Sequence, residues 1–260
     1  PRFGGKTRRF VVFARCERPQ RRMEAPEAPL DTPARRKLAQ EEKERQKREE
    51  KEALEAAQRV QRLAQTEALV AKRTDNFAYL KELHAEGGYW LNVVLLTKSI
   101  LEDFVRREVS KARIEQLFFL GVSLGKILDI QSGPTVLQAV LQLFEEWEYW
   151  MAGSTTQGVK WVMAKSSAKP HPTTAAVPSS PEDAVKAGLY RFHSEVIYER
   201  LCLPQLSIEI DYFELIISLC ETLTLLYKKF LESDCYSNAL LFDALMRMDA
   251  KVKQHLVNHI

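Results

Sequence analysis

Apolar residues recur three and four positions apart through most of the chain after residue 76, which is the spacing of one face of an α-helix. Leu137, Val140, Leu141 and Phe144 show this spacing clearly. Helix breakers are scarce there, because most of the Pro residues lie in the stretches 19–33 and 170–181. We therefore predict an all-α protein, an antiparallel bundle of about seven helices with a long charged N-terminal helix.

Stop and start signals divide the periodic region into separate helices. Gly87-Gly88 is expected to end the first, and Ser180-Pro181-Glu182-Asp183 combines an N-cap Ser, a Pro at the first helical position and an acid in the first turn. The helices expected in the bundle run over about 76–86, 89–109, 114–128, 134–151, 181–203, 211–231 and 241–256.

The stretch 34–75 contains neither Gly nor Pro and carries opposite charges four residues apart, as in Glu41/Arg45 and Glu44/Arg48. Between residues 41 and 52 it has no apolar side chain, which favours an exposed helix. A weak apolar seam follows, and a coiled coil with itself or with a partner is the second interpretation. The members of this seam are Ala53, Ala56, Val60, Leu63, Glu67, Val70, Thr74 and Phe77.

Composition divides the 260 residues into three parts. Residues 1–33 are expected to be a disordered leader, residues 34–75 the charged helix or weak coiled coil, and residues 76–260 a helical domain with a mobile loop at 152–180, where Ser, Thr, Pro and Ala dominate. The basic charge is concentrated in residues 1–22, with eight Lys and Arg against one acid. Met23 is a candidate start, with residues 1–22 a processed or alternative leader.

The body after residue 75 has eighteen basic and twenty-two acidic residues, so it has no evident field for binding phosphate. Four Cys residues without a CxxC pair predict free thiols in a reducing compartment. No apolar run is long enough to predict a membrane span. A cytoplasmic protein is expected, with the centrosome or cilium as candidate locations.

Gly121-Val122-Ser123-Leu124-Gly125 matches the G-x-S-x-G pattern of a serine-hydrolase nucleophile elbow. That elbow requires a strand before the serine, whereas the helical period continues through it. We favour helix packing, with Gly121 and Gly125 facing a neighbouring helix, and expect Gly121→Leu to destabilise the fold and Ser123→Ala to be nearly silent. A serine hydrolase that uses Ser123 is the alternative.

His255 and His259 lie four residues apart on the last expected helix, a spacing that could share a metal ion. Leu256 occupies the position where a metalloprotease would carry its glutamate, and the Cys spacings match no zinc module. We therefore predict no metal site, no cofactor and no catalytic residue.

The segment Glu145-Glu146-Trp147-Glu148-Tyr149-Trp150 combines three acids with three aromatic residues. One interpretation is a further packing contact in the core, and the other is an acid-rimmed aromatic patch that binds a partner. Trp161, in the predicted loop, could act either as a tucked-in staple or as a docking residue. The candidate interaction residues are Trp147, Tyr149, Trp150 and Trp161.

These patterns predict a non-enzymatic adaptor or scaffold subunit of a cytoplasmic complex, with cytoskeletal, centrosomal or ciliary assemblies as candidate settings by analogy. Protein partners are expected to bind the N-terminal helix and the aromatic patches, and neither nucleic acid nor a small-molecule substrate is expected. Besides the hydrolase, one further alternative stays open. It is an RNA- or ribosome-associated factor that uses the basic N-terminus.

Overall fold

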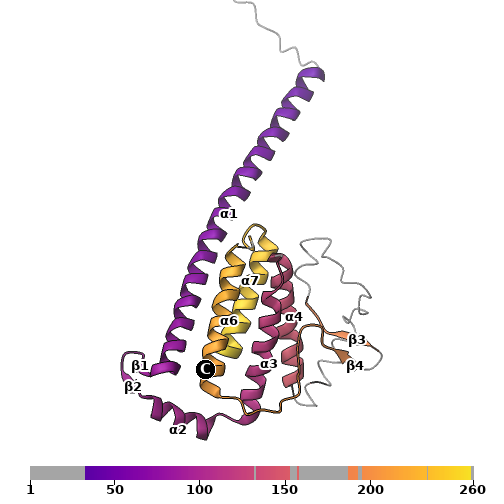
Figure 1. Cartoon of the computed structure of the whole chain (residues 1–260). Helices are drawn as coiled ribbons and strands as arrows, with labels where there is room; N and C mark the ends of the chain where they lie inside the picture. The colour runs from indigo at the N-terminus through magenta and orange to yellow at the C-terminus, as the bar shows by residue number, and fades with distance from the viewer. Residues whose placement is uncertain are drawn as a thin grey trace, which may run out of the picture. The chain divides into compact units, whose positions relative to one another are not determined.

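The computed structural model describes residues 33–131, 133–152, 157, 187–192, 195–232 and 234–258. Within this part of the chain, six α-helices, one terminal π-helical turn and two short hairpins follow one another (Figure 1). The all-α prediction is confirmed there, whereas the count of about seven helices stays a prediction. The leader, most of the predicted 152–180 loop and Trp161 lie outside the described residues.

The structure separates into two units, Pro1–Lys51 and Glu52–Ile260. Helix α1, Pro33–Glu86, contributes residues to both. In the first unit, every side chain from residue 37 to residue 51 is exposed, and Arg45 forms an i,i+4 ion pair with Glu49 at 3.4 Å. This pattern of solvated charges was expected from the sequence.

In the second unit, α1 buries one stripe of side chains. The buried residues are Thr66, Val70, Arg73, Phe77, Leu80, Leu83 and His84. Arg73 donates two hydrogen bonds to Asp249, at 2.6 and 2.7 Å, and the Phe77 ring contacts Tyr227. Of the predicted seam, the core takes up Val70 and Phe77 within the chain, whereas Glu67 is exposed. The coiled-coil interpretation gains no support from these residues.

Helix α1 ends at Gly87, as predicted, because Gly87 adopts a left-handed φ of +80° and donates to the Leu83 carbonyl at 2.9 Å. The single helix expected over 89–109 is wrong. Strands β1 (Gly88–Trp90) and β2 (Val94–Leu96) form an antiparallel hairpin, and α2 begins only at Lys98. Aromatic and β-branched residues favour the strands, and Thr97 caps the helix through its side chain.

Four helices enclose the core of the second unit: α3 (Lys111–Leu128), α4 (Gly133–Met151), α6 (Tyr212–Glu232) and α7 (Ala239–Val252), which continues into the π-turn η2 (Lys253–Val257). Helix α3 packs on α4 and α6, and α4 packs on α6 and α7 (Figure 1). The apolar residues at helical spacing in the range 241–256 form the inner face of α7 and η2. Leu241, Leu245, Met248, Val252 and Leu256 are all buried.

The helix expected over 181–203 is wrong wherever this stretch is described. Strands β3 (Tyr190–Phe192) and β4 (Glu195–Ile197) pair antiparallel, and no regular element spans 198–211. We call residues 198–211 the strap. Side chains of α3 and α4 bind the backbone N–H groups of residues 199–202, in place of the carbonyl partners that a helix would provide.

Candidate protein-interaction site

Ser123 lies in the middle of α3 and is fully buried. Its hydroxyl donates to the Phe119 carbonyl at 2.7 Å and accepts from the backbone N–H of Cys202 at 2.9 Å. A nucleophile elbow would instead expose the hydroxyl at a turn between a strand and a helix. Ser123 therefore does not lie at an elbow of this kind, and its hydroxyl joins the strap to α3.

Glu146 of α4 binds the residues of the strap that precede Cys202. Its carboxylate accepts from the backbone N–H groups of Glu199 and Arg200, both at 2.9 Å, and of Leu201 at 2.8 Å. Gln142 adds a fourth donor at 2.7 Å. Because an ionised carboxylate only accepts hydrogen bonds, it matches a row of N–H donors, and charge-assisted bonds of this kind are strong. Glu146 is thus an internal clamp.

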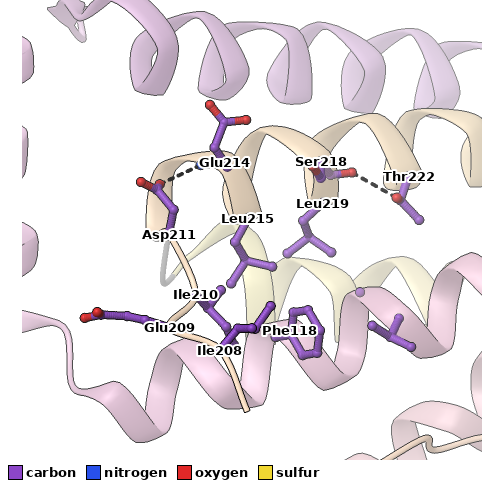
Figure 2. A pocket seen from close by; sticks show the side chains of 12 residues that line it. Phe118, Ile208, Glu209, Ile210, Asp211, Glu214, Leu215, Ser218, Leu219 and Thr222 are labelled. Atoms are coloured by element: carbon purple, nitrogen blue, oxygen red, sulfur yellow. Dashed lines mark hydrogen bonds between the residues drawn. The ribbon is translucent and has the colours of Figure 1, made fainter. Parts of the chain in front are cut away.

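The far end of the strap forms one wall of a groove between α3 and α6. The groove has a volume of about 380 Å³. Its apolar lining comes from Phe118, Val122, Ile208, Ile210, Leu215 and Leu219. Figure 2 shows Phe118, Ile208 and Leu215 turned toward one another. We call this feature the strap groove. Ser123 and Glu146 bind the strap at residues 199–202, before the segment that lines the groove.

Acidic residues border the strap groove. Glu209, Asp211 and Glu214 are the charged residues among those that line it, and all three are exposed. Asp211 also caps α6, because its carboxylate accepts from the N–H groups of Phe213 at 2.8 Å and Glu214 at 3.0 Å. Figure 2 shows the three carboxylates at the margin of the apolar cluster. The groove therefore combines an apolar floor with a negative rim.

The two glycines of the GVSLG segment differ in their surroundings. A Cβ on Gly121 would lie 3.8 Å from Leu219 of α6, which is an ordinary contact, and Gly121 lines the strap groove. A Cβ on Gly125 would meet no atom within 4 Å. The close helix packing predicted for both glycines is wrong at Gly125, and at Gly121 the missing side chain leaves space in the groove.

The aromatic segment of α4 faces inward at its centre. Trp147 is fully buried and Trp150 packs edge-on against Phe119, so the predicted patch is wrong for Trp147 as a docking residue. Tyr149 and Trp150 are half-buried. The sequence could not distinguish this arrangement from a surface patch, because acids next to aromatic residues occur in both.

The neighbouring Glu148 also binds within the fold. It pairs with Lys251 at 2.6 Å and with His255 at 2.9 Å. Burial opposes ionisation of Glu148, but hydrogen bonds and charge from Lys251 and His255 outweigh it and lower its pKa. His255 is thus the partner of a carboxylate, and His259 lies outside the described residues. No group of residues suited to a metal ion occurs in the described ranges.

A second candidate surface covers the first hairpin and α2. Within the described residues, large apolar side chains that are exposed gather here. They are Tyr79, Tyr89, Trp90, Leu91, Val93, Val94, Leu95, Ile100 and Phe104. We call this set the hairpin surface. Leu91 is 73% and Val93 is 79% exposed, so the tip of the hairpin presents apolar side chains to solvent. Sequence reasoning missed this surface because it expected one amphipathic helix over 89–109 in place of the hairpin and α2.

Helix α2, Lys98–Glu108, buries none of its residues. Ile100 and Phe104 are each about half exposed, whereas Val105 packs against the core. Asp103 and Arg106 pair at 3.4 Å. A helix of eleven residues is marginal in isolation and usually depends on packing of its apolar face. The apolar face of α2 is therefore suited to contact with another molecule.

Comparisons with protein-family models, with curated proteins and with solved structures find no match to this chain. None of the described helices has the length and the apolar run needed to cross a membrane.

Proposed function

We propose that this protein is a non-enzymatic adaptor or scaffold subunit that binds a protein partner through the hairpin surface. The observation that carries the proposal is the gathering of exposed apolar side chains on the hairpin and α2. Large contiguous apolar patches on a folded protein mark sites of interaction, whereas isolated apolar residues are normal. Trp and Tyr, which dominate binding hot spots, occur here as Trp90 and Tyr89.

Backbone geometry at the hairpin tip supports this proposal. Leu91 and Asn92 both have left-handed φ values, +52° and +57°. Asn accepts this conformation well, but a leucine there costs roughly 1–2 kcal/mol because its Cβ approaches the carbonyl oxygen. Gly or Asn would relieve the strain and would also remove the exposed apolar side chain. Strained residues of this kind are typical of functional sites, and the Leu91 side chain is 73% exposed.

The tertiary structure favours binding over the hydrolase alternative. Ser123 is buried, and its hydroxyl both donates and accepts a hydrogen bond within the fold. The RNA alternative depends on residues 1–22, which lie outside the described part, so it stays a prediction. Assembly into a cytoplasmic complex is likewise a proposal, and an antiparallel bundle of α3, α4, α6 and α7 would be its rigid support.

The decisive experiment compares the wild-type chain with a Leu91→Asn/Val93→Asn/Phe104→Gln variant. Each chain is expressed in cells with an affinity tag, purified in its native state, and analysed by size-exclusion chromatography with light scattering and by cross-linking. We expect a stoichiometric assembly with a partner or with a second copy in the wild type. We expect it to be lost in the variant, with cross-links mapping to residues 79–104.

A matched control places the same kind of change elsewhere. Leu225→Asn and Leu240→Gln remove exposed apolar side chains from α6 and α7, outside the hairpin surface. These variants are expected to keep the assembly, and circular dichroism should show that all chains remain folded. A monomeric wild type without a partner, or an assembly that survives in the hairpin variant, would disprove the proposal.

A further inference from the structure

We infer that the strap groove binds a basic, apolar peptide segment of a partner protein, with the apolar side chains of the segment in the groove and its Lys or Arg residues at the acidic rim. This inference concerns residues other than the hairpin surface and does not depend on the function proposed for that surface. It rests on the shape of the groove, the charge at its rim and the position of Gly121.

The shape of the groove suits a peptide. Its volume of about 380 Å³ lies near the lower end of the roughly 300–1,000 Å³ found for small-molecule sites. One wall is the strap, where Ile208 is 71% exposed, so the groove opens to solvent along that side. An open apolar groove between two helices is the usual receptor for the apolar face of an amphipathic segment.

The charge at the rim of the groove indicates that the ligand is positively charged. The apolar floor is bordered by Glu209, Asp211 and Glu214, and the groove lining contains no Lys, Arg or His. At this end of α6, burial raises the pKa of Tyr212 and the charge of Arg113 opposes that rise, but the Arg113 guanidinium donates to the His255 carbonyl at 2.8 Å. The rim therefore attracts cations and repels acidic segments, and opposite potentials across an interface give specificity.

Gly121 makes the strap groove deeper, because it has no side chain to fill it. It lies on the floor beside Leu219, and any side chain at this position would occupy space that the ligand needs. The fold itself does not require glycine here, since a Cβ would make only an ordinary contact at 3.8 Å. A glycine inside a helix costs about 1 kcal/mol relative to alanine. Helix packing does not explain a glycine at position 121, whereas the need for space in a ligand-binding groove does.

The experiment selects peptides from a random display library on the immobilised full-length chain, whose hairpin surface is left unchanged. Selected peptides are then titrated by fluorescence anisotropy against four chains: the wild type, Gly121→Leu, Glu209→Lys/Glu214→Lys and Gly125→Leu. Gly125→Leu is the matched control, because it makes the same change one helical turn away, where a Cβ meets no neighbour within 4 Å.

We expect the selected peptides to be apolar with net positive charge. Gly121→Leu and the double charge reversal should each weaken binding by about tenfold or more, and Gly125→Leu should bind like the wild type. Binding should also weaken as the salt concentration rises from about 0.05 to 0.5 M. Because Gly121→Leu could unfold the chain, Gly121→Ala is titrated as well. It should keep the fold and still weaken binding several-fold.

The inference is overturned if no peptide is enriched, if the enriched peptides are acidic or uncharged, or if Gly121→Ala and a folded Gly121→Leu bind them as tightly as the wild type. Any of these results would leave the hairpin surface untouched as a binding site, so the two proposals fail separately.

Discussion

The hydroxyl oxygen of Ser123 lies 2.9 Å from the backbone nitrogen of Cys202, a residue 79 positions later in the chain. This hydrogen bond joins α3 to the strap at a point where no regular element holds the strap backbone. Together with the three backbone N–H groups bound by Glu146, it satisfies four successive donors of an irregular segment. Buried N–H groups without a partner are costly, so these two side chains determine where the strap can lie.

The first prediction concerns Ser123→Ala. The sequence alone predicted a nearly silent substitution, but the structure reverses this expectation. Removal of the hydroxyl leaves the Cys202 N–H without its partner, which we expect to lower the free energy of unfolding by about 1–3 kcal/mol. Urea denaturation followed by circular dichroism measures this loss. Ser218→Ala, at an exposed position of α6, is the control and should change stability little. Equal midpoints for both variants would contradict the prediction.

A second prediction concerns Glu146→Gln. The two side chains have the same shape, but an amide presents N–H donors where the strap also presents donors. At least one strap N–H then loses its acceptor, and we expect a loss of about 2–4 kcal/mol. Hydrogen exchange should show lost protection at residues 199–201. Glu145→Gln is the neighbouring control, because Glu145 makes only a partly exposed ion pair with Lys251. If hydrogen-exchange protection at residues 199–201 were unchanged in Glu146→Gln, Glu146 would not be what holds the strap backbone.

The sequence predicts a segment well when the groups that bind its backbone lie close to it along the chain, and poorly when they lie far away. The helices α3, α4, α6 and α7 follow from their own periodicity, because their backbone bonds are internal and their apolar faces repeat at 3.6 residues. The strap could not be predicted, since its N–H groups bind Ser123 and Glu146, which are distant in the chain. Only residues 198–203 of the strap were assigned to a helix, the one expected over 181–203.

The candidate sites were harder to predict than the fold. Glu146 has the sequence context of a surface acid, and only the tertiary structure shows that it is buried. The run 89–96 is apolar except for Asn92, and periodicity cannot distinguish a strand from a buried helix in so short a run. Two local signals could have found the hairpin. They are the Asn92 turn residue and the Thr97 N-cap.

A third prediction tests the junction of α1 and the hairpin through Gly87→Ala. A Cβ on Gly87 would lie 2.6 Å from the Leu96 carbonyl oxygen, and its φ of +80° disfavours any side chain. We expect a loss of more than about 1 kcal/mol in unfolding free energy, measured by chemical denaturation. Gly88→Ala is the matched control, because its Cβ would make an ordinary 3.6 Å contact with Leu83. If both substitutions cost the same, the left-handed cap is not what holds this junction.

The last prediction concerns acid stability and the half-buried Asp249. Burial would raise its pKa, but hydrogen bonds from Arg73, at 2.6 and 2.7 Å, and from Tyr227, at 2.6 Å, lower the pKa below its ordinary value. A carboxyl group with a lowered folded-state pKa stabilises the protein fully above the unfolded-state pKa of about 4. This contribution is lost as the pH falls from there toward the folded-state pKa.

Asp249→Asn isolates this contribution, because all other titrating groups are shared with the wild type. At neutral pH the variant leaves Arg73 buried without its charge partner, so we expect it to be less stable by about 3–5 kcal/mol. The difference between wild type and variant should shrink as the pH falls below about 4, since the wild type then loses its own carboxylate. Urea denaturation of both chains between neutral pH and pH of about 3 measures the difference. If the stability difference between wild type and variant stays constant over this range, Asp249 does not titrate with a lowered pKa. If the difference widens as the pH falls, the folded-state pKa of Asp249 is raised instead.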